Sequence, residues 1–292
     1  MYPAPFAYLR ATSWTQAIDW LQEHGDDAKL LAGGQSLVPM MNLRLVQASH
    51  VIDLNAIPSA GIDRAGDVLT VDALTRHAEL EESPLLADAC PMLGEAAGLI
   101  GNIRVRHRGT IGGSVAHADP SAELPCALVA LRATIRVLGP RGERRIPASA
   151  FFMSFFTTAL EPAEVVVGVD VPIPPGTTGS AFLETVRRTG DFAIVGVAAA
   201  VRLDASGTCT DVGVAVAGTG DRPEDLSEPA AAIVGTTVED ERVAEASRAV
   251  ADATQPRGDE RASSDYRRRL TQVLTRRALG SARDRARASA AR

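Results

Sequence analysis

The chain has 292 residues, 46% of them apolar and 23% charged, which is the composition of an ordinary globular protein with room for two or three small domains. Its net charge of −6 argues against a nucleic-acid-binding protein. Three scattered cysteines, Cys90, Cys126 and Cys209, exclude a self-contained iron–sulfur site and favour a reducing compartment. Without a signal-peptide pattern or a membrane-length apolar run, the sequence predicts a cytoplasmic protein.

The first part of the chain predicts a small unit of two strands and a helix. Apolar residues recur at helical spacing over residues 14–24. Short apolar runs at 28–32 and 51–54 predict strands. After the first of these runs comes Ala32-Gly33-Gly34-Gln35-Ser36-Leu37, the first of two glycine loops. Residues 1–57 are therefore expected to form a first subdomain.

Residues 58–175 are expected to form a second subdomain, in which strand-like and helical patterns alternate. A basic and apolar run from Ile103 to Arg108 predicts a strand that leads into the second glycine loop, Thr110-Ile111-Gly112-Gly113-Ser114. The other expected strands are at 68–71, 134–138 and 165–171. One helix is expected to begin near Thr75, and two others are expected over 85–99 and 124–131.

A stretch rich in Pro, Gly and Thr at 172–179 marks the expected boundary of a third domain, residues 176–292. Its β-rich segments predict a three-stranded antiparallel sheet, and helical patterns follow. The strands are expected at 181–187, 193–203 and 210–217, and the helices at about 227–235, 238–252 and 264–285. The tail from Ser281 to Arg292 has no apolar stripe and is expected to be frayed.

In both glycine loops a Gly-Gly pair is followed within two residues by serine, a pattern that suits anion binding. Glycine can adopt φ > 0 and aim several N–H groups at one point, and the serine hydroxyl adds a donor. Two such loops can hold both phosphates of a dinucleotide. For either loop alone, a simple turn is the alternative. Neither loop fits GxGxxG or GxxxxGK[ST], which argues against a Rossmann-type nicotinamide enzyme or a nucleoside triphosphatase.

The residues around both loops form longer motifs. Residues 29–45 read KLLAGGQSLVPMMNLRL, and residues 101–125 read GNIRVRHRGTIGGSVAHADPSAELP. Two more motifs are Gly190-Asp191-Phe192-Ala193-Ile194-Val195 and Tyr266-Arg267-Arg268-Arg269-Leu270. Together they resemble the FAD-binding medium subunit of the molybdenum hydroxylases, the family of xanthine dehydrogenase and carbon monoxide dehydrogenase. The resemblance implies an α+β protein: a two-subdomain FAD-binding fold of the vanillyl-alcohol-oxidase/PCMH type, followed by a small C-terminal α+β domain.

The resemblance also implies the parts of an FAD site. The first loop would receive the pyrophosphate, and the second would take the rest of the diphosphate and the ribityl chain. Asp119 and Glu123 would accept hydrogen bonds from FAD hydroxyls. The candidate FAD-binding residues are Lys29, Ala32, Gly33, Gly34, Gln35, Ser36, Leu37, Thr110, Ile111, Gly112, Gly113, Ser114, His117, Asp119, Glu123, Phe192, Ile194 and Val195.

Structural alternatives stay open for several of these residues. Lys29 would otherwise be a solvated strand-edge lysine, Asp119 a helix cap before Pro120, and His117 a packed loop residue. The segment from Asp191 to Val195 would otherwise be only the start of a strand. Arg104 and His107 depart from the family pattern, which leaves their role open.

The implied function is that of an oxidoreductase subunit whose FAD transfers electrons. They would come from a large molybdenum-cofactor subunit through a small subunit with two [2Fe-2S] clusters, in a dimer of heterotrimers, and pass to a quinone, NAD or another acceptor. The alternatives are a self-sufficient FAD-dependent oxidase or dehydrogenase and a scaffold that has lost FAD. The substrate of the complex stays open among carbon monoxide, a purine, an aldehyde and an N-heterocycle.

Overall fold

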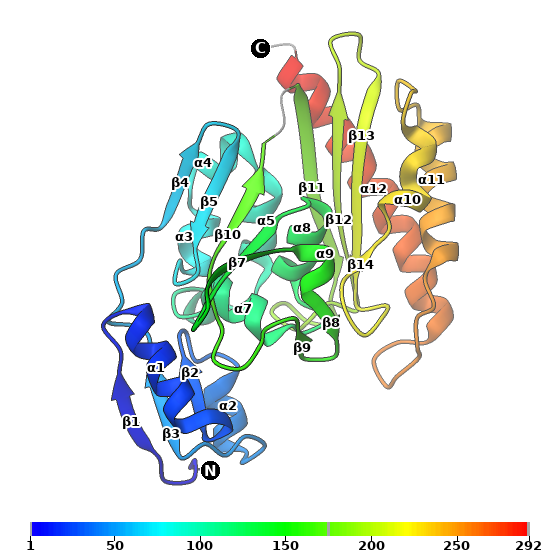
Figure 1. Ribbon diagram of the computed structural model, residues 1–292. Helices are drawn as coiled ribbons and strands as arrows, with labels where there is room; N and C mark the ends of the chain where they lie inside the picture. The colour runs from blue at the N-terminus through cyan, green and yellow to red at the C-terminus, as the bar shows by residue number, and fades with distance from the viewer. Residues whose placement is uncertain (1, 174–175, 291–292) are drawn as a thin grey trace.

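The computed structural model describes residues 2–173 and 176–290, and it contains three main sheets with covering helices (Figure 1). Pro174 and Pro175, inside the expected domain boundary, lie outside the described residues. In the described ranges, none of the helices has the length and apolar character that a membrane crossing requires.

The N-terminal unit, blue in Figure 1, is a three-stranded parallel sheet of order β1-β3-β2. Strand β1 was not expected from the sequence because its residues are mostly exposed and carry no apolar alternation. The Ser13 hydroxyl caps the first helix by accepting from the Gln16 N–H at 3.2 Å. The elements are β1 (Ala7–Arg10), α1 (Trp14–His24), the 3₁₀ turn η1 (Gly25–Asp27), β2 (Ala28–Leu31), α2 (Leu37–Asn42) and β3 (His50–Asp53).

The middle of the chain forms a five-stranded antiparallel sheet of order β4-β5-β10-β6-β7. Its strands are β4 (Ile62–Ala65), β5 (Val68–Asp72), β6 (Thr134–Gly139), β7 (Gly142–Pro147) and β10 (Val165–Pro172). The accompanying elements are α3 (His77–Glu81), α4 (Pro84–Ala89), α5 (Pro91–Leu99), α6 (Ile103–Arg106), α7 (Ile111–His117), α8 (Glu123–Ala130), α9 (Ala148–Phe151), β8 (Phe152–Ser154) and β9 (Thr157–Thr158).

Two sequence predictions in this region are corrected. The helix expected over 85–99 is divided at Cys90, because Pro91 begins a new helix instead of continuing the old one. The strand expected over Ile103 to Arg108 is helix α6. The Asn102 side chain accepts from the N–H groups of Arg104 and Val105, and this N-cap starts a helical turn despite the strand-like composition.

The C-terminal region has a four-stranded antiparallel sheet of order β11-β12-β13-β14, one strand more than expected. The extra strand is only two residues long and is too short for a sequence pattern. The elements are β11 (Thr177–Thr185), β12 (Val195–Leu203), β13 (Cys209–Ala217), β14 (Glu224–Asp225), α10 (Ser227–Ala230), the 3₁₀ turn η2 (Ala231–Ile233), α11 (Asp240–Ala253) and α12 (Ser264–Ala290).

Helix α12 continues through most of the tail that was expected to be frayed. Ala278, Ala282 and Ala286 are fully buried on one face of this helix. Their small side chains let the helix backbone lie against the sheet: a Cβ added to Gly179 of β11 would be 1.9 Å from the Ala282 carbonyl oxygen. The buried face of α12 therefore includes a row of alanines, which are too weakly hydrophobic to stand out in the sequence pattern.

The sheet β11–β14 is buried on both faces. Ala198 of β12 belongs to the core shared with the middle of the chain, while Val197 and Ala199 belong to the core under α11 and α12. In Figure 1 helix α12, drawn in red, lies against β11 and β12, and α11 packs on α12. Burial on two faces explains why Ala193 to Val201 is a continuous apolar run without alternation.

Candidate functional site

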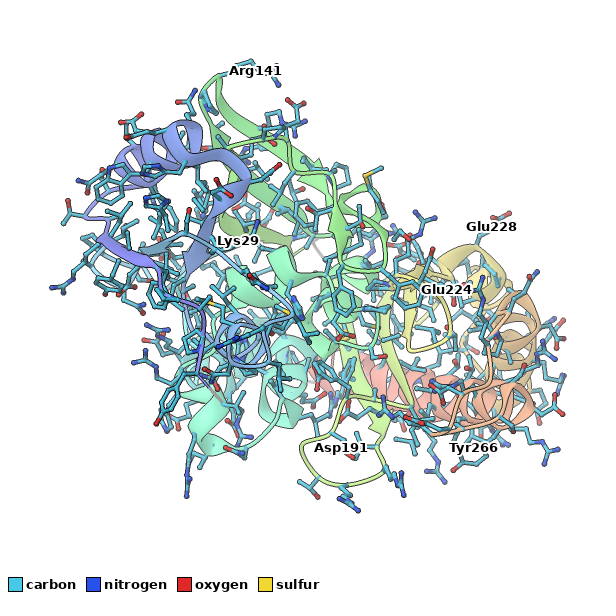
Figure 2. All side chains as sticks on the ribbon, turned by 90° about the horizontal axis from the view of Figure 1, so that it is seen from below. Lys29, Arg141, Asp191, Glu224, Glu228 and Tyr266 are labelled. Atoms are coloured by element: carbon cyan, nitrogen blue, oxygen red, sulfur yellow. The ribbon has the colours of Figure 1, made fainter. Side chains whose placement is uncertain are left out.

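A cavity of about 980 Å³ lies between the N-terminal unit and the rest of the chain. Its wall includes the first glycine loop, parts of the second, the segment 160–166 after β9, and Gly190 to Phe192 from the loop between β11 and β12. In Figure 2, Lys29 belongs to the N-terminal part and Asp191 to the loop that follows β11. The volume is at the upper end of the range for small-molecule sites, roughly 300–1,000 Å³.

The first glycine loop presents free hydrogen-bond donors to this cavity. The backbone N–H groups of Gly33, Gly34, Gln35 and Ser36 have no acceptor among the residues that the structure describes. Gly34 is in the left-handed region, with φ = 74°, as expected for a nest of converging N–H groups. Ser36 precedes α2 without a capping hydrogen bond from its side chain, so its hydroxyl is also free.

The first glycine loop is in direct backbone contact with Arg108 and Gly109, the two residues just before the second glycine loop. A Cβ added to Gly33 would lie 2.2 Å from the carbonyl oxygen of Arg108 and 2.6 Å from the Cα of Gly109. No side chain fits in that gap. Glycine is therefore required at position 33 by the approach of the second loop, and not by a positive φ.

A side-chain bridge holds the loops at this distance. The Asn55 amide donates to the Ala32 carbonyl at 2.9 Å. Its oxygen accepts from Arg76 at 2.6 Å, and Arg76 also donates to the Arg108 carbonyl. The Arg76 guanidinium thus connects one loop to the other through charge-assisted hydrogen bonds.

The second glycine loop has a different conformation from the first, and the expectation of a shared φ > 0 geometry is corrected. Thr110 is the N-cap of α7, and neither Gly112 nor Gly113 has a positive φ. The N–H groups of the last four residues of this loop are already used within the protein. They donate from Ile111 to Thr75 O (3.1 Å), from Gly112 to Ala73 O (2.9 Å), from Gly113 to Thr110 Oγ1 (3.1 Å) and from Ser114 to Thr110 O (3.0 Å).

Two carboxyl groups lie at the cavity wall beyond α7. Asp119 accepts from the Ser121 N–H at 2.8 Å and is not a helix cap, because α8 begins at Glu123 and its N-cap is Ala122. Glu123 is only 3% exposed. Burial, reinforced by the nearby Glu184 and Asp119 carboxylates, raises the pKa of Glu123 to about 8.

Three other expected residues line the cavity. Lys29 is half-buried and its Nζ donates to the Asp26 carbonyl at 3.2 Å. The His117 ring lies 5.0 Å from that of Phe156, and burial lowers the pKa of His117. Phe192 is 46% exposed at the wall.

Ile111, Ile194 and Val195 are not brought to the cavity wall. Their side chains are buried in the two larger cores, because α7 turns Ile111 toward the five-stranded sheet and β12 begins at Val195. The other expected FAD-binding residues, from both loops and from Asp119, Glu123 and Phe192, line the cavity of about 980 Å³.

Several wall residues were not expected from the sequence. One end of the cavity is lined by apolar side chains that include Trp14, Leu21, Leu160 and Val165. Trp14 and Leu21 carry the core stripe of α1, and nothing in that pattern distinguishes a cavity wall from a packed core. His77, under the second loop, had no signal beyond being one of five scattered histidines.

Comparison with known proteins assigns the chain to a family. Residues 4–174 match the family model described as the FAD binding domain in molybdopterin dehydrogenase, and residues 180–282 match the CO dehydrogenase flavoprotein C-terminal domain. The chain belongs to the FAD-binding flavoprotein family of the molybdopterin dehydrogenases. The recognition made from the glycine-loop motifs is confirmed, as are the FAD-binding fold and the oxidoreductase class.

Individual members of this family are similar over most of their length. The 6-hydroxypseudooxynicotine dehydrogenase complex subunit alpha of Paenarthrobacter nicotinovorans is 44% identical over 211 residues, 72% of this chain and 71% of that protein. The glyceraldehyde dehydrogenase medium chain of Sulfolobus acidocaldarius is 34% identical over 280 residues, which cover 96% of this chain and 99% of that protein. The carbon monoxide dehydrogenase structure from Hydrogenophaga pseudoflava has 37% sequence identity and a TM-score of 0.93. The match covers 98% of this chain and 99% of that chain.

The buried carboxyl of Glu123 predicts a pH dependence of stability. The pKa of Glu123 is about 8 in the folded chain, above the ordinary value of 4.5. The protonated carboxyl therefore contributes fully to the stability of the folded state below pH 4.5, and this contribution is lost as the pH rises through 8. The loss is on the order of a few kcal/mol. Urea unfolding of the flavin-free chain at pH 5 and pH 8.5 measures it.

The matched variant for this prediction is Glu123→Gln, which keeps the shape and removes the titration. We expect the difference in unfolding free energy between the two pH values to shrink in Glu123→Gln. Glu184, whose pKa burial raises to about 7, accounts for the part that stays. An equal difference in the variant and the unsubstituted chain would contradict the assignment.

Proposed function

We propose that this chain binds one noncovalent FAD in the cavity and serves as the electron-transfer flavoprotein subunit of a molybdenum hydroxylase complex. The observation that carries the proposal is the row of four backbone N–H groups from Gly33 to Ser36 at the cavity wall, which have no partner within residues 2–173 and 176–290. Backbone N–H groups that converge without a partner are typical of anion sites, so this row supports the binding of an anionic ligand here. The family match supplies the ligand, FAD.

The residues along the cavity suit the successive parts of FAD. The first loop would hold the pyrophosphate with its free N–H groups and the Ser36 hydroxyl. The apolar end, which includes Trp14 and Leu21, suits a flat adenine ring. Glu123 and Asp119 suit hydroxyl groups, and Phe192 lies at the exposed part of the wall, where it can cover the isoalloxazine. Bound FAD supplies two-electron redox chemistry, and the chain contributes binding, orientation and exclusion of water.

The proposed partners follow from the relatives. These include carbon monoxide dehydrogenase medium chains, and the solved relatives include a Cu,Mo-CO dehydrogenase and quinoline 2-oxidoreductase. By this similarity, electrons would reach the FAD from a molybdenum subunit through an iron–sulfur subunit, in a dimer of heterotrimers, and leave to a quinone, NAD or another acceptor. The domain division at residues 57 and 175 and a cytoplasmic location belong to the same proposal. The substrates that appear in the names of the relatives are carbon monoxide, an aldehyde and several N-heterocycles.

The test combines cofactor analysis with anaerobic reduction. Acid precipitation of the purified chain should release FAD into the supernatant, with about one FAD per chain. Candidate substrates should leave the flavin of the isolated chain oxidised and should bleach it only in the complete complex. FAD-free protein under all conditions would favour the scaffold alternative, and rapid bleaching without partners would favour the self-sufficient oxidase.

A further inference from the structure

The cavity wall is built from two parts of the chain, so a long ligand must contact both. The first glycine loop belongs to the N-terminal unit, whereas Asp119, Glu123 and Phe192 belong to the rest of the chain. A ligand that spans two parts binds more tightly when their spacing is fixed beforehand, because the parts then need no ordering on binding. The side-chain bridge of Asn55 and Arg76 is placed to fix that spacing.

Arg76 is anchored in the larger part of the chain. Its neighbours are hydrogen-bonded to the backbone around the second glycine loop: the His77 N–H donates to the Gly109 carbonyl at 3.1 Å, and the Ile111 N–H donates to the Thr75 carbonyl at 3.1 Å. The backbone from which the Arg76 side chain extends is therefore held at a defined position.

Asn55 is anchored in the N-terminal unit. Its backbone N–H donates to the Asp53 carboxylate at 2.9 Å, and its side-chain Nδ2 donates both to Asp53 and to the Ala32 carbonyl, the latter at 2.9 Å. Asp53 also accepts from the Tyr8 hydroxyl of β1. With both amide hydrogens donated inside this unit, the amide oxygen of Asn55 is the atom left to accept from outside it.

The Arg76 guanidinium connects the two anchors. One nitrogen donates to the Asn55 Oδ1 at 2.6 Å, and another donates to the Arg108 carbonyl, the atom that approaches Gly33 most closely. Arg76 is half-buried, and within the described residues it is not part of the cavity wall. Two charge-assisted bonds from one rigid, planar group hold their acceptors in a fixed relative position.

We propose that Arg76 is a positioning residue for FAD, which sets the spacing between the first glycine loop and the opposite side of the cavity. It acts through Asn55 and the Arg108 carbonyl and does not touch the ligand. Without Arg76, Asn55 still holds Ala32, so the local turn of the first loop stays. What is lost is the fixed distance from that loop to the carboxyl groups beyond α7. This inference rests on the proposed function and makes it more specific.

The first test compares FAD with inorganic pyrophosphate, which is small enough for the first loop alone. In the flavin-free full-length chain, Arg76→Met should weaken FAD binding about tenfold, because the two parts must then be ordered on binding. Pyrophosphate affinity, followed by the NMR signals of the N–H groups from Gly33 to Ser36, should change by less than about twofold. An equal loss for both ligands would place the effect in the loop itself and would overturn the proposal.

Two further variants separate position from charge. Arg76→Lys keeps the charge but not the planar fork, so it should weaken FAD binding about as much as Arg76→Met, and it serves as the second variant if Arg76→Met does not fold. Arg108→Met removes an exposed cation and keeps the carbonyl that Arg76 uses, so FAD affinity should stay within about twofold. Full affinity in Arg76→Lys, or a tenfold loss in Arg108→Met, would overturn the proposal.

The last test is a double-mutant cycle. Asn55→Ala should weaken both FAD and pyrophosphate, since it also releases Ala32. Arg76→Met should then cost less FAD affinity in the Asn55→Ala background than in the unsubstituted chain, because both residues act through one bridge. Fully additive losses would overturn the proposal. Normal FAD affinity in the Arg76 variants would overturn only the role of Arg76, whereas no binding of FAD or pyrophosphate to the unsubstituted chain would overturn the proposed site itself.

Discussion

Gly33→Ala should weaken FAD binding by roughly 100-fold, equivalent to about 3 kcal/mol. The added methyl carbon would lie 2.2 Å from the Arg108 carbonyl oxygen and 2.6 Å from the Gly109 Cα. Both neighbours are backbone atoms, so the loops must move apart. The free N–H groups of Gly33 and Gly34 then lose their alignment, and about two charge-assisted hydrogen bonds are lost.

Fluorescence titration of FAD onto the flavin-free variant measures the change. Gly280→Ala is the matched control, because a Cβ at Gly280 of α12 meets nothing within 4 Å and the position is remote from the cavity. The control should keep its affinity and its circular dichroism spectrum. Normal FAD affinity in Gly33→Ala would exclude the first loop as the diphosphate site.

Arg267→Met should reduce the free energy of unfolding by about 3 kcal/mol, the cost of leaving two backbone carbonyls without their donor. The Arg267 side chain is 4% exposed. Its guanidinium donates to the Ile194 carbonyl at 2.6 Å, the Gly218 carbonyl at 2.8 Å and the Asp259 carboxylate at 2.7 Å. Methionine fills much of the space but leaves the Ile194 and Gly218 carbonyls without this donor, whereas Asp259 still accepts from the N–H groups of Arg261 and Ala262.

The adjacent Arg268 provides the control, since it is exposed on the same helix. Arg268→Met should change the unfolding free energy by no more than about 0.5 kcal/mol. Urea unfolding followed by circular dichroism compares the two variants. Equal stabilities would mean that the Arg267 network does not hold α12 to the ends of β12 and β13.

The first glycine motif predicted a turn with a positive φ, and the structure has one at Gly34. The conformation of Gly34 is a local property, since a positive φ costs glycine nothing, and the free N–H groups follow from that local turn. The apolar patterns likewise predicted three strands of the five-stranded sheet, β5, β6 and β10, and the long β12 and β13, because burial on a sheet needs a continuous or alternating apolar run.

The conformation of the second loop could not be predicted from its own residues. Its letters resemble those of the first, but its N–H groups are used by the carbonyls of Ala73 and Thr75 and by the Thr110 cap, so it forms a helix start. Gly33 is needed because Arg108, 75 residues later, lies against it. Neither partner can be identified from the motif alone.

The sequence by itself determined the family, the FAD-binding motifs and most of the strands, because these depend on residue type and short-range backbone preference. Only the tertiary structure decided which N–H groups of the two glycine loops are used within the described residues, that the alanine face of α12 is core, and that His77 lies against Ser114. The physical reason is that the partner of a buried polar group is supplied by segments distant in the chain, and its hydrogen-bonding state depends on that partner.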